Sequence, residues 1–159
     1  MVIIQFTKLT GLYSFFLGFF FGYRWYDKHK VTPKYSFGHG LSYTTFAYGK
    51  IIIEGRTVSC DITNTGLVRG AEVVQLYVGF GDQRFGKDQR EETVKQLKGF
   101  GKYYLNPSET VRATFVLKDR DLSYWDIENT RWALKVGKAE VSIGSSSTDI
   151  RATGTINVN

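Results

Sequence analysis

The sequence predicts an all-β fold, a sandwich of about seven or eight strands with an irregular extension at its N-terminus. Three observations lead to this prediction. Short stretches of alternating apolar and polar residues recur from Tyr43 to the C-terminus, turn-forming residues separate them, and no convincing helical pattern interrupts them. Short strands separated at such regular intervals are typical of β-sandwiches and barrels.

The first half of the sandwich is predicted from three stretches. Phe46 to Ile53 is rich in aromatic and β-branched residues, and the turn residues Gly55-Arg56 follow it. Residues 57–63 alternate between polar and apolar side chains, so one face of this strand should be buried. Asn64-Thr65-Gly66 ends that strand with turn chemistry. Glu72 to Val78 is mainly apolar, as expected of a central strand.

A loop, two strands and a linker are predicted next. Residues 80–92 are polar and charged and should form a long loop. Residues 94–105 predict one bent strand or two short strands, because Gly99-Phe100-Gly101 interrupts them. The alternation over 111–117 predicts another strand, and 119–130 is interpreted as a linker.

The last part of the chain predicts three more strands. Trp132, Leu134 and Val136 alternate with polar or small residues, which predicts a strand with Trp132 in the core. Residues 139–143 and 150–158 are the remaining strands, separated by a serine-rich turn. Together these elements indicate an immunoglobulin-like sandwich.

Composition limits the classes of function. The 159 residues are 42% hydrophobic, enough for one core, and the single cysteine, Cys60, allows no internal disulfide. The net charge is +6, but the Lys and Arg residues are scattered and form no basic stripe with interleaved aromatics, so no nucleic-acid partner is expected. One cysteine and two histidines disfavour a metal site, and no cofactor is expected.

One stretch is especially informative, Phe37-Gly38-His39-Gly40-Leu41-Ser42-Tyr43-Thr44. It resembles the F-G-H-G-L-S-Y-T signature of glycoside hydrolase family 3. In the β-glucosidases and β-xylosidases of that family, the signature opens a C-terminal fibronectin type III-like domain. The resemblance therefore implies an immunoglobulin/fibronectin type III-like β-sandwich that is an accessory domain.

Further blocks occur in the family's order and extend the resemblance over residues 18–159. They resemble the family's G-Y-R-x-Y-D, N-T-G, G-x-E-V-V-Q-L-Y-V, L-K-G-F, D-L-S-Y-W-D and G-x-S-S-x-D-I segments. In this sequence they begin at Gly22, Asn64, Gly70, Leu97, Asp121 and Gly144. We expect residues 35–159 to form the fibronectin type III-like domain and residues 1–34 to combine a non-family N-terminus with the remnant of an interdomain linker.

The resemblance also implies that this chain has no catalytic residues of its own. Retaining glycosidases use two carboxyl groups, one as nucleophile and one as acid/base. The family places the nucleophile in an S-D-W-type motif of a barrel domain and the acid/base in an α/β domain, and no Ser-Asp-Trp occurs here. We therefore expect the chain to be inactive alone. Its expected partners are a parent enzyme's barrel and α/β domains, and the parent would hydrolyse terminal non-reducing β-D-glucosyl residues.

Two other interpretations stay open. The chain could be a stand-alone sandwich that binds carbohydrate, such as a β-glucoside or oligosaccharide, or that binds another protein. It could also be a non-functional gene fragment. Binding to glucan without catalytic domains would distinguish the first of these from the accessory role.

The N-terminus departs from the family. Leucine stands at Leu17 where the family carries glutamate, and residues 1–17 read as foreign, as a truncated or wrongly started gene model would give. A cleaved signal peptide is the alternative, since 12–22 has the length of a signal-peptide core, but no small-x-small site follows it and the compartment stays open. The run is shorter than a membrane span, so no membrane partner is expected.

Four residues are candidates for contact with the edge of a substrate or with a neighbouring domain, namely His39, Trp25, Tyr26 and Arg84. For His39 we favour a structural role, in which the ring braces the turn between its two flanking glycines. Eight of the twelve residues from Phe15 to Tyr26 are aromatic, which predicts a surface that would abut catalytic domains and that would self-associate if left uncovered.

Overall fold

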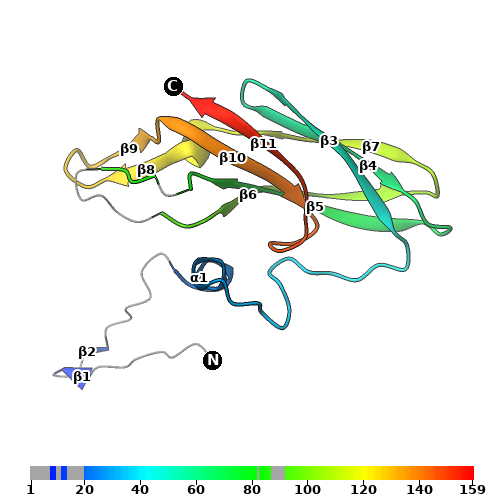
Figure 1. Cartoon of the computed structure of the whole chain (residues 1–159), viewed down its shortest axis with the longest axis horizontal. Coiled ribbons are helices and arrows are strands. Elements are labelled where there is room, and N and C mark those ends of the chain that lie inside the picture. The colour runs from blue at the N-terminus through cyan, green and yellow to red at the C-terminus, as the bar shows by residue number, and fades with distance from the viewer. Residues whose placement is uncertain (1–7, 10–11, 14–19, 82, 87–91) are drawn as a thin grey trace.

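Two antiparallel sheets face each other across one apolar core (Figure 1). The computed structural model describes residues 8–9, 12–13, 20–81, 83–86 and 92–159. The first sheet has the order β11-β10-β5-β6 and consists of β5 (Gly70–Gly79), β6 (Gln96–Leu105), β10 (Gly137–Gly144) and β11 (Ile150–Val158). The second has the order β3-β4-β7 and consists of β3 (Phe46–Glu54), β4 (Thr57–Asn64) and β7 (Thr110–Val116). The predicted all-β sandwich is confirmed.

Shorter elements complete the described part of the chain. They are β1 (Lys8–Leu9), β2 (Leu12–Tyr13), α1 (Tyr23–His29), the 3-10 helix η1 (Asp119–Leu122), β8 (Ser123–Asp126) and β9 (Arg131–Leu134). The extension is therefore not wholly irregular, because Tyr23–His29 is helical. No helix in the described ranges is both long enough and apolar enough to cross a membrane.

The core follows from the alternation seen in the sequence. Val58, Cys60 and Ile62 of β4 are fully buried, because every second side chain of a strand points to the same face. The strands β5 and β10 supply the opposite wall with aliphatic side chains, namely Val74, Leu76, Val78, Val141 and Ile143. Burial of this apolar surface is the main driving force that holds the two sheets together.

Strand β5 is buried on both faces over its second half. Gln75 and Tyr77 point away from the core, yet they are 3% and 0% exposed. The outer face of β5 is covered by the segment that precedes the sandwich, since Gln75 contacts Gly38 and Tyr77 contacts Tyr23. This covered face positions the candidate site described below.

The segment 119–130 differs from the predicted linker. It contains η1 and β8, and β8 pairs with β9 in an antiparallel hairpin in which Trp125 lies opposite Trp132. The prediction that Trp132 is a core residue is wrong, because its side chain is 44% exposed. Alternation identified the strand correctly, but β8 and β9 form a separate two-stranded sheet, and both tryptophans lie on the same face of it at a ring distance of 5.3 Å.

The predicted bend in the stretch 94–105 is present as a β-bulge in one continuous strand. Leu76 of β5 pairs with Gly99, whereas the next residue, Tyr77, pairs with Leu97. Lys98 is therefore the extra residue of β6, without a partner opposite it. A bulge of this kind bends the strand and redirects a side chain.

A buried asparagine joins the two sheets at the end of β4. The Asn64 side chain is completely buried, and its amide nitrogen donates to the carbonyl oxygens of Val68 at 2.9 Å and Leu105 at 3.0 Å. Its amide oxygen accepts from the Thr44 hydroxyl at 2.7 Å and from the Gly66 backbone N–H at 3.0 Å. One side chain therefore satisfies four polar groups, of which the Leu105 carbonyl belongs to a fully buried residue.

We expect Asn64→Leu to lower the free energy of unfolding by about 3 kcal/mol, because the buried Leu105 carbonyl loses its donor and three partly buried hydrogen bonds are lost with it. Urea denaturation monitored by circular dichroism measures this change. The matched control is Thr63→Val, which removes an exposed hydroxyl pair with Thr110 and should change stability by less than about 0.5 kcal/mol. Equal stabilities of the two variants would contradict the role assigned to Asn64.

Candidate functional site

The candidate site is the junction, by which we mean residues 20–45 together with the sandwich surface that they contact. Figure 1 shows α1 on the side of the sandwich that carries β5 and β6. The junction has three parts, the turn 144–149, the loop 36–40 and helix α1.

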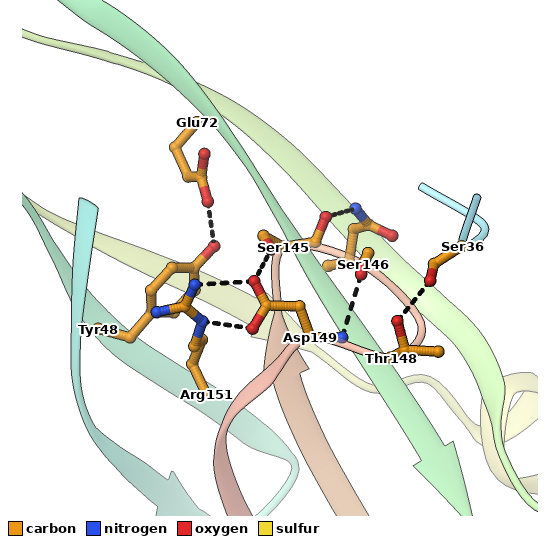
Figure 2. Close-up of polar contacts among 9 residues, drawn as sticks. Ser36, Tyr48, Glu72, Ser145, Ser146, Thr148, Asp149 and Arg151 are labelled. Carbon is orange, nitrogen blue, oxygen red and sulfur yellow. Dashed lines mark hydrogen bonds and ion pairs between the residues drawn. The ribbon is translucent and has the colours of Figure 1, made fainter. Parts of the chain in front are cut away.

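The serine-rich turn between β10 and β11 is held by its own side chains (Figure 2). The Ser145 hydroxyl donates to Asp149 at 2.6 Å, and the Asp149 backbone N–H donates to the Ser146 hydroxyl at 3.0 Å. The Arg151 guanidinium donates to both carboxylate oxygens of Asp149, at 2.6 and 2.8 Å. This pairing is bidentate, the geometry that fixes an arginine and a carboxylate most firmly.

The loop 36–40 is attached to this turn by hydrogen bonds. The Ser147 backbone N–H donates to the Phe37 carbonyl at 2.9 Å, and the hydroxyls of Ser36 and Thr148 form a hydrogen bond (Figure 2). The F-G-H-G and G-S-S-S segments are more than a hundred residues apart in sequence, and the fold brings them side by side.

Gln75 of β5 locks the loop and the turn together. Its amide nitrogen donates to the Gly38 carbonyl at 3.1 Å and also to the Ser145 carbonyl, while its amide oxygen accepts from the Tyr77 hydroxyl at 2.6 Å. Gly38 has a φ of +78°, and a Cβ there would lie 2.1 Å from the Gln75 amide oxygen. Both the backbone conformation and the close contact therefore require glycine at this position.

Helix α1 is docked on the sandwich through Tyr23. The Tyr23 ring stacks on Phe37 at 4.6 Å and meets Tyr77 edge-on at 6.1 Å. Its hydroxyl accepts a hydrogen bond from the Leu97 backbone N–H of β6 at 2.9 Å. Tyr23 thus contacts the loop, β5 and β6 at once.

An ion pair supports the same docking. The Lys95 ammonium lies 2.8 Å from a carboxylate oxygen of Asp27, and both side chains are largely buried. A pair removed from water in this way interacts more strongly than a surface pair. The junction therefore has an apolar contact and a charged contact on one short helix.

The two aromatic residues predicted as contact candidates lie on α1. Trp25 and Tyr26 are partly buried, their rings meet edge-on at 5.4 Å, and Trp25 stacks on His29 at 4.3 Å. They form a small cluster beside Tyr23. Part of the predicted aromatic surface is therefore covered within this chain, at Tyr23, while residues 15–19 lie outside the described residues.

The other two candidates lie on loops. His39 is exposed, and its backbone N–H donates to the Ser36 carbonyl at 3.0 Å. The bracing role expected of the His39 ring belongs to Gln75, which holds the Gly38 carbonyl. Arg84 is exposed and lines a shallow hollow together with Asp27 and Glu92. His39 is not among the residues that line this hollow.

The electrostatics of the junction follow from burial and pairing. The Arg151 guanidinium and the Ser145 hydroxyl hold the pKa of Asp149 below its usual range. Burial raises the pKa of Glu72, which accepts a hydrogen bond from Tyr48 at 2.7 Å (Figure 2), and burial likewise raises the pKa of Tyr77. The ionised form of Asp149 is therefore favoured by its hydrogen-bonding partners, whereas burial favours the neutral forms of Glu72 and Tyr77.

Sequence reasoning missed Gln75 and Tyr23 as the central residues of the junction. Gln75 was detectable as a polar residue inside the otherwise apolar β5, which signals a buried hydrogen-bonding role. Tyr23 gave no separate signal among its aromatic neighbours. Among the described residues, no group of three or more His, Cys, Asp or Glu side chains is placed to hold a metal ion.

Comparison with known proteins shows similarity to a fibronectin type III-like domain and to β-glucosidases. The profile of the fibronectin type III-like domain matches residues 72–147. A probable β-glucosidase D from Aspergillus flavus is 37% identical over 92% of this chain, and a probable β-glucosidase L from Emericella nidulans is 42% identical over 89%. In both cases the chain spans 22% of the relative's length.

Solved structures support the same similarity. A β-D-glucoside glucohydrolase from Trichoderma reesei superposes on 96% of this chain with a TM-score of 0.82 and 35% identity. A β-glucosidase of Bifidobacterium adolescentis superposes on 89% with a TM-score of 0.80 and 35% identity. The chain covers 24% and 21% of those two proteins.

We expect Gln75→Leu to lower the free energy of unfolding by about 2–3 kcal/mol and to release the loop 36–40, because the carbonyls of Gly38 and Ser145 lose their donor and the buried Tyr77 hydroxyl loses its acceptor. Hydrogen exchange of the Ser147 amide, which donates to Phe37, reports the release. Gln83→Leu is the control, since its amide makes an exposed contact with the Lys138 carbonyl. Unchanged protection of Ser147 in the Gln75 variant would show that the loop is held by other contacts.

We expect Tyr23→Phe to lower the free energy of unfolding by about 1 kcal/mol, because the Leu97 N–H loses its acceptor. Tyr26→Phe, on the same helix, should leave stability within about 0.5 kcal/mol. Thermal denaturation of both variants makes the comparison. An equally small effect at both positions would mean that α1 is not docked through the Tyr23 hydroxyl.

Proposed function

Residues 72–147 of this chain belong to the fibronectin type III-like domain family, and from that premise we propose that the chain is an accessory domain of a β-glucosidase-type glycoside hydrolase. In this role it packs against catalytic domains and stabilises them. The parent enzyme hydrolyses terminal non-reducing β-D-glucosyl residues, and the chain supplies no group to that reaction.

The single observation that carries this proposal is the rigid junction. The segment 20–45 leads into the sandwich, and Gln75 and Tyr23 fix it to strands β5 and β6 instead of leaving it as a free tether. A fixed connection favours a defined position of a preceding domain relative to the sandwich. Such a connection suits a domain whose task is support.

Four of the described carboxylates give a second line of support. Asp61 and Asp149 are each held by an arginine, Arg112 and Arg151 respectively. Asp27 and Glu92 line one hollow, but Asp27 pairs with Lys95 at 2.8 Å and Glu92 with Lys135 at 2.7 Å. Glycoside hydrolysis needs one carboxyl group that can donate a proton and a second that can attack or activate water. Carboxylates neutralised by neighbouring cations are poorly suited to either task.

We expect the purified chain to release no nitrophenol from 4-nitrophenyl β-D-glucoside above the buffer background, because the two carboxylates that share a hollow among the described residues, Asp27 and Glu92, are each already paired with a lysine. The Trichoderma reesei enzyme serves as the positive control. A clear rate that disappears in a Glu92→Gln or Asp27→Asn variant would overturn the proposal and would make this chain a glycosidase itself.

A further inference from the structure

A second hollow, of about 290 Å³, lies between helix α1, strand β6, helix η1 and the hairpin β8–β9. It borders the junction through Arg24 of α1, but none of the contacts described above for the junction lies within it. Its size lies near the lower end of the range found for small-molecule sites, about 300 Å³ and above. It can accept a ligand with roughly one six-membered ring. We call it the hairpin pocket.

The walls of the hairpin pocket are aromatic. Phe85 stacks on Tyr124 at a ring distance of 5.8 Å, and Trp125 lies 5.3 Å from Trp132. Aromatic walls of this kind favour a flat, apolar ring over an extended polar chain.

The pocket is strongly cationic. Four of its lining residues are basic, namely Arg24, Lys98, Arg120 and Lys135, whereas Glu92 is its only acidic lining residue among those described. Glu92 is already paired with Lys135, at 2.7 Å. Three positive charges therefore remain without a carboxylate in the pocket lining.

Two of the cations are held in place by the fold. Lys98 is the bulge residue of β6 and is partly buried. Desolvation and the neighbouring Lys135 lower its pKa, against the smaller opposing effect of the Asp121 and Glu92 carboxylates. Arg120 lies over the Trp132 ring, 3.0 Å from its centroid, so that stacking limits the freedom of the guanidinium. A cation that is desolvated and faces another cation is stabilised when an anion binds beside it.

A buried hydroxyl without a partner adds a further polar group. Thr93 lines the hairpin pocket, is 3% exposed, and its hydroxyl makes no hydrogen bond within the described part of the chain. Buried hydroxyls are normally hydrogen-bonded, so a group left unpaired in a pocket lining points to a ligand or water that completes it.

We propose that the hairpin pocket binds a small organic anion that carries one planar ring. The ring would lie between the aromatic walls, and its acidic group would meet Lys98 and Arg120. A neutral sugar fits less well, because Arg120 already covers one face of Trp132. This inference does not depend on the accessory role.

Isothermal titration calorimetry of the full chain at low salt tests the proposal with four probes. Benzoate and phenyl phosphate combine a ring with an anion, benzamide has the ring alone, and inorganic phosphate has the charge alone. We expect at least one aryl anion to bind at least about tenfold more tightly than benzamide and than inorganic phosphate. A tenfold difference in affinity corresponds to about 1.4 kcal/mol of binding free energy. Equal binding of benzamide or of inorganic phosphate, or no binding of either aryl anion, would overturn the proposal.

Single substitutions inside and outside the hairpin pocket test whether the aryl anion binds there. Lys98→Met should weaken the aryl anion about tenfold or more, and Lys102→Met is its control, because Lys102 lies on the same strand but is exposed outside the pocket. Arg120→Gln, at an exposed position, provides a second variant that should fold normally and should also weaken binding. Unchanged affinity in both Lys98→Met and Arg120→Gln, or an equal loss in Lys102→Met, would show that the anion binds elsewhere.

Discussion

The hydrogen bonds of Gln75 are the constraint on which the arrangement of the junction depends. Strand β5 needs only apolar residues to build the core, yet a glutamine at its centre points outward and is buried by the loop 36–40. A buried amide needs hydrogen-bond partners, and the Gln75 amide nitrogen finds them in the loop carbonyl of Gly38 and the turn carbonyl of Ser145. Three segments far apart in the sequence are thereby fixed at one point.

Much of the sandwich could be predicted from the sequence, because apolar and polar residues that alternate along a strand indicate which face of that strand is buried. The strand 57–63 is the clearest case, since Val58, Cys60 and Ile62 are all fully buried. The same reasoning failed at Trp132. Alternation reports the type of element but not the sheet to which it belongs, and β9 pairs only with β8 in a hairpin outside the two main sheets.

The candidate site was harder to predict because its contacts are long-range. The sequence singled out His39 for its glycine neighbours, but the group that holds the turn comes from β5, and nothing local to residues 36–40 identifies it. Helix α1 was also missed, since its seven residues are docked by Tyr23 and by the Asp27–Lys95 pair, not by an amphipathic pattern of useful length. Short elements of this kind depend on tertiary contacts for their stability.

The central claim is that this chain is a supporting domain of a glycosidase, and a domain exchange in the Trichoderma reesei β-D-glucoside glucohydrolase tests it most directly. The measurement is the temperature of half-inactivation of β-glucoside hydrolysis in three proteins. These are the intact enzyme, the enzyme with residues 20–159 of this chain in place of its similar region, and the enzyme without that region. The account predicts that the exchanged protein stays close to the intact enzyme and that the shortened protein inactivates at a clearly lower temperature. A shortened enzyme as heat-resistant as the intact one would contradict it.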